Sequence, residues 1–252
     1  MKKIALISGV ASGIGKCVAE NLSNAGVEVF GLDKSNINLD KINFYQCDIS
    51  KESEVINCIR EISRQTEKID YLVNAAGIFC CENRYLIEDL PMNEWEKVFD
   101  VNLKGMVLLT KYTIPLMKKS LNGNIVNFSS EQVVMPQEKS APYAVTKAAI
   151  EMFSKILAME LMANKIRVNT IAMASVRTNF LQTYLKDDEK INEMMQKSEI
   201  KMPFGLIEPI DVYELVKYLI FDNKKMTGQT LLMDSGTVLD INRKKKRSEN
   251  NV

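Results

Sequence analysis

The chain has 252 residues, of which 46% are hydrophobic, and this length allows one large core in a single α/β domain. Its 33 Lys and Arg residues balance 32 Asp and Glu residues. The resulting net charge of +1 provides no field that would attract nucleic acid or an anionic membrane. The absence of histidine excludes histidine-based triads and most catalytic zinc sites. Five cysteines lack C-x-x-C spacing, so we expect reduced thiols, no metal site and a cytoplasmic protein.

The first ten residues, MKKIALISGV, superficially resemble the start of a signal peptide, because two lysines precede a short apolar run. The run stops at Gly9 and continues into a glycine-spaced turn. No stretch approaches the roughly 20 apolar residues that a membrane-spanning helix needs. We therefore expect neither a secretory leader nor a membrane span.

Apolar runs rich in β-branched residues alternate with longer segments of helical periodicity. This rhythm predicts βαβ units with right-handed crossovers and an α/β fold whose parallel sheet of about seven strands is flanked by helices on both faces. Strands are expected at 4–8, 27–32, 43–47, 71–74, 124–128, 167–172 and 230–233. Helices are expected over 13–25, 52–66, 93–119, 142–163 and 211–221.

No linker or internal repeat divides the chain, so residues 1–240 are expected to form one domain, followed by a solvated basic tail at 241–252. The segment 179–208 interrupts the βα rhythm after the sixth strand. In it, charged KDDEK precedes a Met-rich amphipathic stretch and the loop-like MPFGLIEP. A substrate lid and a surface helical hairpin are both open interpretations of this segment.

The first strand leads into SGVASGIG, whose G-x-x-x-G-x-G spacing precedes a helix. Gly9 would permit the tight turn, Gly13 the close approach of a pyrophosphate, and Gly15 the packing of the helix on the strand. The first amides of the helix would then hold the phosphates. The motif favours a Rossmann-type, doubly wound sheet that binds a dinucleotide, and the alternative is a glycine-rich turn without a ligand.

The second strand ends in Asp33, which bears on the choice of cofactor. A carboxylate there can accept hydrogen bonds from the adenosine ribose and would repel the extra phosphate of NADP. Ser12, rather than a basic residue, precedes Gly13, which agrees, whereas Lys34 is contrary evidence because it could hold a 2′-phosphate. NAD is therefore the expected cofactor, and NADP is the less favoured one.

A second group of residues carries acid/base chemistry. Ser130 lies at the carboxyl end of the fifth strand, where ligands bind in open α/β sheets. Tyr143 and Lys147 are four residues apart at the start of a helix, so they share one face. A phenol has a pKa of about 10, which positive charge from Lys147 and an oxidised nicotinamide would lower. Tyr143 would then exchange a proton with a substrate oxygen held by Ser130. An isolated Y-x-x-x-K is more often a pair on a helix surface than a catalytic pair.

The order of these motifs resembles the short-chain dehydrogenase/reductase family over residues 3–236. Further matches are the strand end Asn74-Ala75-Ala76-Gly77, with one alanine added, Asp48 for the acidic residue beside the adenine, Asn102 in VNLKG, and Thr178 for the threonine that contacts the nicotinamide carboxamide. The resemblance implies a catalytic set of Asn102, Ser130, Tyr143 and Lys147. It implies cofactor contacts from Gly9, Ser12, Gly13, Ile14, Gly15, Asp33, Asp48, Ile49, Asn74, Ala75, Gly77, Tyr143, Lys147, Val176 and Thr178.

Two further expectations follow from the resemblance. Asn102 would kink its helix and hold a water that links Lys147 to solvent. The family usually has Pro-Gly after the sixth strand, where this chain has Met173-Ala174, so the backbone beneath the nicotinamide has different restrictions. Met173 either fills space there or lines a distinctive substrate pocket.

The resemblance implies an NAD-dependent oxidoreductase that interconverts a secondary alcohol and a ketone of a small-molecule substrate. The alternatives are an NADPH-dependent reductase of 3-oxoacyl groups and a dinucleotide-sensing protein without turnover. Family pockets are lined at positions that correspond to Phe79, Arg84, Glu131, Gln132, Gln137 and Phe180. The Glu-Gln pair suggests a hydroxylated substrate, although both side chains could equally be solvated.

Assembly is the last expectation. The helices at 93–119 and 142–163 are apolar around more of their circumference than one sheet face requires. Excess apolar surface on paired helices predicts a symmetric homo-oligomer, and the family resemblance implies a dimer or tetramer.

Overall fold

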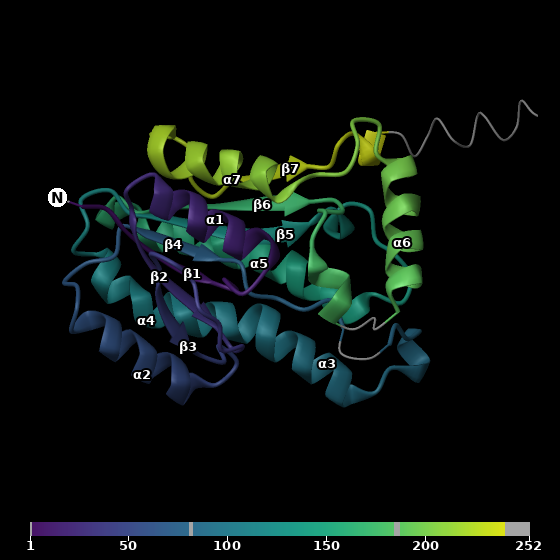
Figure 1. The fold of residues 1–252 in the computed structure, drawn as a ribbon, viewed down its shortest axis with the longest axis horizontal. Coiled ribbons are helices and arrows are strands. Elements are labelled where there is room, and N and C mark those ends of the chain that lie inside the picture. Colours follow the sequence, from purple (N-terminus) through teal and green to yellow (C-terminus); the bar gives the residue numbers. More distant parts are fainter. Residues whose placement is uncertain (1, 81–82, 184–186, 240–252) are drawn as a thin grey trace, which may run out of the picture.

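The computed structural model describes residues 2–80, 83–183 and 187–239, and these form one sheet of seven strands in the order β3-β2-β1-β4-β5-β6-β7 (Figure 1). The strands are β1 (Ile4–Ser8), β2 (Glu28–Asp33), β3 (Asn43–Gln46), β4 (Tyr71–Asn74), β5 (Asn124–Ser130), β6 (Arg167–Met173) and β7 (Thr230–Met233). All neighbouring strands pair in parallel. The predicted Rossmann-type, doubly wound sheet is confirmed, while Cys81 and the tail at 241–252 lie outside the described residues.

Apart from α6, for which no helix range was predicted, the helices follow the expected ranges to within a few residues. They are α1 (Gly13–Asn24), α2 (Glu52–Ser63), α3 (Met92–Phe99), α4 (Met106–Met117), α5 (Ala141–Leu161), α6 (Asp188–Lys201) and α7 (Pro209–Lys217). The helix expected at 93–119 differs, because the π-helical segment η2 (Asp100–Gly105) separates α3 from α4. A second π-helical segment, η6 (Tyr218–Asp222), extends α7.

The helices form a layer on each face of the sheet (Figure 1). On one face, α1 and α7 pack through Val18, Leu22 and Val212 onto side chains such as Ile7 of β1. On the other face, α2, α4 and α5 build a second cluster. Because both faces are covered, the strands are almost continuously apolar, which is the sequence pattern that predicted a parallel sheet.

The topology also fixes where a ligand can bind. The strand order reverses between β1 and β4, and open parallel sheets bind ligands beyond the carboxyl ends of the strands at such a switch point. Ser8, Asp33, Asn74 and Ser130 are the last residues of their strands, so they lie at this same edge. Figure 1 shows α6 beyond this edge of β5 and β6.

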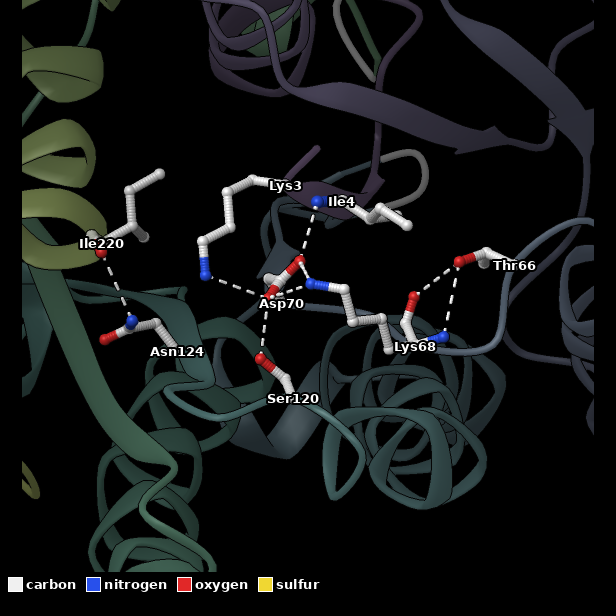
Figure 2. Close-up of polar contacts among 8 residues, drawn as sticks. All are labelled: Lys3, Ile4, Thr66, Lys68, Asp70, Ser120, Asn124 and Ile220. Atoms are coloured by element: carbon white, nitrogen blue, oxygen red, sulfur yellow. Dashed lines mark hydrogen bonds and ion pairs between the residues drawn. The ribbon is translucent and has the colours of Figure 1, made fainter. Parts of the chain in front are cut away.

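The opposite edge of the sheet is tied together by one buried carboxylate (Figure 2). Asp70 accepts hydrogen bonds from the Ile4 amide at 3.0 Å and the Ser120 hydroxyl at 2.7 Å. The amines of Lys3 and Lys68 lie 3.2 and 2.8 Å from its oxygens. Burial alone would raise the pKa of Asp70, but these bonds outweigh it and hold the pKa below its ordinary value. The cluster stabilises the fold away from the candidate site.

The segment 179–208 contains a short 3₁₀ turn, η5 (Asn179–Thr183), and then α6, with residues 184–186 outside the described part. α6 buries Ile191 and exposes most of its other side chains. The following loop is anchored, since Met202, Leu206 and Ile207 join the core. Ile207 also forms a parallel bridge with Val176. MPFGLIEP is thus a loop, as expected, and the lid stays a prediction.

Candidate active site

The glycine turn after β1 requires glycine for steric reasons. Gly9 and Gly13 have φ values of +78° and +55°, in the left-handed region that favours glycine. A Cβ on Gly9 would lie 2.8 Å from the backbone of Ala76, and a Cβ on Gly15 would collide with the carbonyl oxygen of Gly9. A Cβ on Gly13 would lie 3.2 Å from the side chain of Thr178. The turn therefore brings the N-terminal motif against Thr178, as the cofactor hypothesis requires.

The turn opens directly onto the N-terminus of α1. Within the described chain, the Ser12 side chain makes no capping hydrogen bond, so it does not compete for the first amides of the helix. A pocket of about 360 Å³ lies here, and it is lined by Ser12, Gly13, Lys16, Arg177 and Thr178 among others. A cradle that a Cβ would fill, followed by a helix N-terminus, fits a pyrophosphate. The residues present therefore suit a dinucleotide.

Asp33 lies beside this turn at the end of β2. One carboxylate oxygen accepts the amide of Ala11 at 3.0 Å, and the other accepts the amide of Ser35 at 2.9 Å. Each oxygen keeps a lone pair for a further donor, such as a ribose hydroxyl. Lys34 is exposed, and its backbone carbonyl accepts a hydrogen bond from the side-chain amide of Gln46 at 3.0 Å.

Asp48 and Ile49 follow β3 at the same edge of the sheet. Asp48 accepts the amide and hydroxyl of Ser50 at 3.0 and 2.7 Å, which fixes a tight turn. Ile49 is buried against Gly105 of η2, where a Cβ would lie 2.8 Å from the Ile49 side chain. These contacts hold the turn against η2.

The end of β4 connects the glycine turn to the second group of residues. Asn74 donates to Asn127 at 2.7 Å and to Thr110 at 3.2 Å, while its own oxygen has no partner in the described part of the chain. Ala75 then passes behind Gly9, and a Cβ on Gly77 would lie 3.9 Å from the Lys147 amine.

Asn102 lies in η2 and is only 1% exposed. Its oxygen accepts the Ile78 amide at 2.8 Å, and its amide donates to the Ile78 carbonyl at 2.8 Å and to Thr146 at 3.4 Å. The expected interruption of the helix is present at Asn102. Through these bonds the Asn102 side chain holds the loop after β4, and the local sequence does not reveal this contact. The sequence analysis did not identify Thr146 as a partner, although it lies one residue before Lys147.

Ser130, Tyr143 and Lys147 meet at the carboxyl end of β5. Ser130 lies close enough to the Tyr143 phenol to lower its pKa. The Lys147 amine lies 5.4 Å from the centre of the Tyr143 ring and donates to the Phe128 carbonyl at 3.0 Å. The i, i+4 spacing on α5 therefore places phenol and amine side by side, as the sequence predicted.

Aromatic and polar side chains surround the phenol. The ring of Phe79 lies 4.7 Å from that of Tyr143, and the ring of Phe180 lies 6.2 Å from it. Arg84 lies over Phe79 at 5.3 Å and donates to the Glu138 carbonyl at 2.6 Å. Two of the expected lining residues, Glu131 and Gln132, are buried in the 3₁₀ turn η3 (Glu131–Val133), whereas Gln137 is exposed.

Burial dominates the proton affinities of this group in the polypeptide alone. Burial raises the pKa of Tyr143 to about 12, the Ser130 side chain opposes this rise, and the charge of Glu131 adds to it. Burial also lowers the pKa of Lys147 to about 8. Both shifts favour the neutral forms. The expected lowering of the Tyr143 pKa therefore needs more positive charge than Lys147 supplies.

The structure shows what Met173 and Ala174 do in place of the family's usual Pro-Gly. Met173 is 8% exposed and belongs to the core cluster on the α1 and α7 face. The Ala174 amide donates to the Met233 carbonyl of β7 at 3.1 Å. Met173 therefore fills interior space, which answers the question that the sequence left open. Nearby, the Thr178 hydroxyl accepts the Phe180 amide at 3.3 Å.

Fold and site together define a dinucleotide-dependent oxidoreductase, and comparison with known proteins agrees. Residues 3–189 match the short chain dehydrogenase family. The chain is 32% identical over 243 residues to an NAD-dependent glycerol dehydrogenase from Listeria innocua, covering 93% of each chain. It is 30% identical to a 3-oxoacyl-[acyl-carrier-protein] reductase from Thermotoga maritima, covering 94% of this chain and 98% of that one. The ligand-free aldohexose dehydrogenase of Thermoplasma acidophilum superposes with a TM-score of 0.87 at 27% identity, covering 94% of each chain.

The chain belongs to the short-chain dehydrogenase/reductase family and is an NAD(P)-dependent oxidoreductase acting on CH–OH groups. The family expected from the motifs is thus confirmed. Across the described ranges, no helix is both long and apolar enough to cross a lipid bilayer.

Proposed function

We propose that the protein is an NAD-dependent dehydrogenase that interconverts a secondary alcohol and a ketone, with Tyr143 as the general acid and base. The observation that carries this proposal is the meeting of Ser130, Tyr143 and Lys147 at the carboxyl end of β5, where Ser130 lowers the pKa of the phenol and the Lys147 amine lies 5.4 Å from the centre of the Tyr143 ring. This edge of the sheet also carries the glycine turn. A substrate oxygen at the phenol would therefore lie near a dinucleotide seated on that turn.

When bound, the nicotinamide accepts or supplies the hydride and, in its oxidised form, adds positive charge near Tyr143. That charge and the Lys147 ammonium favour the Tyr143 phenolate, which opposes the effect of burial. In alcohol oxidation the phenolate takes the hydroxyl proton of the substrate, and in ketone reduction the phenol returns a proton to the carbonyl oxygen. Ser130 donates a hydrogen bond to the same oxygen and so fixes its position. Asn102 keeps the loop that carries Gly77 and Phe79 against this group.

Asp33 supports the choice of NAD over NADP. Its carboxylate is held beside the glycine turn by the Ala11 and Ser35 amides, so it cannot move away from a ligand without losing both bonds. A fixed negative charge there favours the ribose hydroxyls and disfavours a 2′-phosphate. The NAD-dependence of the glycerol dehydrogenase relative supports the same choice.

Assembly as a dimer or tetramer is part of the proposal. The outer face of α5 exposes Met152, Ile156 and Met159 by 58, 48 and 70%, and Met162, the residue that follows α5, is 56% exposed. Neighbouring apolar side chains on one helix favour burial against a second copy. Light scattering after size exclusion tests this expectation.

Among the described residues, Cys17, Cys47 and Cys58 form no disulfide bond, which supports a reducing compartment such as the cytoplasm.

The function is tested by titrating the protein with NADH and NADPH and following alcohol oxidation at the nicotinamide absorbance. Tyr143→Phe should bind NADH normally, because the ring contacts with Phe79 and Phe180 remain. Its kcat should fall by about 10²- to 10⁴-fold, because the transferable proton is lost. Tyr112→Phe, which removes an exposed hydroxyl bonded to Glu52, is the matched control and should keep wild-type kcat.

Near-normal turnover by Tyr143→Phe would refute the assigned role. Turnover with NADPH and acyl thioesters, but not with NADH and alcohols, would replace the proposal by the acyl reductase alternative. NADH binding without turnover of any substrate would favour a sensor of the dinucleotide.

A further inference from the structure

Two buried polar side chains next to Ser130 lack hydrogen-bond partners. Glu131 and Gln132 are 7 and 8% exposed, and within the described ranges neither Glu131 Oε2 nor Gln132 Oε1 has a partner. Buried polar atoms in folded proteins are almost always satisfied, so each exception needs an explanation. Two adjacent exceptions at a candidate active site point to a ligand that supplies the missing donors.

Hydrogen bonds of the backbone hold in place the turn that carries both residues. The Gln132 amide donates to the Ser130 hydroxyl at 3.2 Å, and the Glu131 carbonyl accepts the amides of Val134 and Met135 at 3.0 and 2.8 Å. η3 is therefore a fixed turn directly attached to Ser130. A residue in this turn can contact a substrate whose oxygen Ser130 holds.

The Glu131 carboxylate also interacts electrostatically with the phenol, because its charge raises the pKa of Tyr143. Burial raises the pKa of Glu131 itself to about 7, Asp234 after β7 adds to the rise, and Lys201 at the end of α6 opposes it. The charged and titratable groups that act on Glu131 are thus Tyr143 of α5, Asp234 after β7 and Lys201 of α6.

We propose that Glu131 and Gln132 form a subsite for a hydroxyl group on the carbon next to the reacting carbon, so that the substrate is a vicinal diol or polyol. This inference deepens the proposed function and rests on it. Both unpartnered atoms are acceptors. A hydroxyl on one neighbouring carbon supplies one donor, and a polyol with hydroxyls on both flanking carbons supplies a donor for each acceptor while Ser130 and Tyr143 hold the reacting oxygen. In a 3-oxoacyl group the carbons next to the ketone carry no hydroxyl, so such a substrate leaves both acceptors unsatisfied. The subsite therefore favours polyols over acyl thioesters.

The test uses propan-2-ol, propane-1,2-diol and glycerol, which share a secondary carbinol and differ only in flanking hydroxyls. The wild-type kcat/KM should rise about tenfold or more from propan-2-ol to a hydroxylated member, because a hydrogen bond to a charged group is strong. Glu131→Gln, which keeps the side-chain volume, should remove most of this ratio. Glu138→Gln removes an exposed carboxylate nearby and should keep the wild-type ratio.

The pH dependence sharpens this comparison. The ratio of diol to propan-2-ol kcat/KM cancels the shared titration of Tyr143 and leaves that of Glu131. Because the ionised carboxylate is the better acceptor, the wild-type ratio should rise with pH through about 7, and Glu131→Gln should show a flat ratio. A ratio that is the same in both proteins at every pH would overturn the proposal.

A second measurement does not depend on turnover. In protein labelled with ¹³C at the glutamate carboxyls, the Glu131 signal is the one missing from Glu131→Gln. Propane-1,2-diol, added with NADH, should lower the pKa of this signal, because donated hydrogen bonds favour the charged form, and propan-2-ol should not. A shift without turnover would keep the subsite and refute the dehydrogenase. An unchanged pKa, or a larger effect from 1-aminopropan-2-ol that marks an ammonium site, would overturn the polyol subsite.

Discussion

Replacing Asn102 by alanine should weaken both the fold and the turnover, because this side chain joins η2 to the loop after β4. Its amide group makes two bonds of 2.8 Å to the amide and carbonyl of Ile78. Ile78 lies between Gly77, which is beside the Lys147 amine, and Phe79, which contacts the Tyr143 ring. The perturbation therefore reaches Tyr143 and Lys147, the proposed catalytic residues, through the position of the backbone.

The magnitude follows from the contacts. Leaving a buried donor or acceptor without a partner costs about 1–3 kcal/mol for each group. Ile78 is half-buried, so water can recover part of this loss, and alanine is a better helix former than asparagine. The expected net decrease in the free energy of unfolding is about 2 kcal/mol. A displacement of the loop by a fraction of an ångström should lower kcat by about 10- to 100-fold.

Urea unfolding followed by circular dichroism measures the first effect, and NADH formation measures the second. Asn57→Ala is the matched control, because it makes the same change at an exposed position of α2. It should alter the free energy of unfolding by less than about 0.5 kcal/mol and leave kcat unchanged. If Asn102→Ala unfolds at the same urea concentration as this control and keeps its kcat, the loop is not held by Asn102.

Two other variants test the cofactor choice and the opposite edge of the sheet. Asp33→Asn removes a charge at constant size and should lower the ratio of kcat/KM for NAD over NADP by about tenfold or more, whereas an unchanged ratio would show that Asp33 does not read the ribose. Asp70→Asn should lower the free energy of unfolding by about 3 kcal/mol, against less than about 0.5 kcal/mol for Asp100→Asn at an exposed pair with Lys104. Because folding lowers the pKa of Asp70, its contribution is present above the ordinary carboxyl pKa of about 4 and is lost as the pH falls through the folded value, so Asp70→Asn should also flatten the acid side of the stability profile. Equal losses in both aspartate variants would contradict the role given to the buried cluster.

Local patterns were enough to predict most of the fold and the proximity of Tyr143 and Lys147. The strands at 4–8, 71–74 and 230–233 match β1, β4 and β7 residue for residue, because short apolar runs end at polar or turn-forming residues. The start of α1 at Gly13 follows from the glycine spacing. The i, i+4 relation of Tyr143 and Lys147 needs only helical geometry, and the structure places them side by side.

The π-helical break at η2 marks a limit of such patterns. Apolar periodicity predicted one helix over 93–119, but the extra residue in each π-helical turn leaves only a weak trace in that periodicity. The family resemblance, rather than the spacing, indicated an interruption at Asn102. Its partner, Ile78, comes from a distant loop, so the bond itself could not be read from the chain.

The sequence by itself determined the parallel α/β fold, the glycine turn and the Tyr143–Lys147 pair, because each depends on residues close together in the chain. Only the tertiary structure decided which polar groups are buried without a partner and what Met173 fills. Burial and electrostatic surroundings depend on segments far apart, as Asp234 and Lys201 do for Glu131. From the sequence, the Glu131-Gln132 pair was equally compatible with a solvated loop, and packing of η3 against α5 made it a buried pair of acceptors.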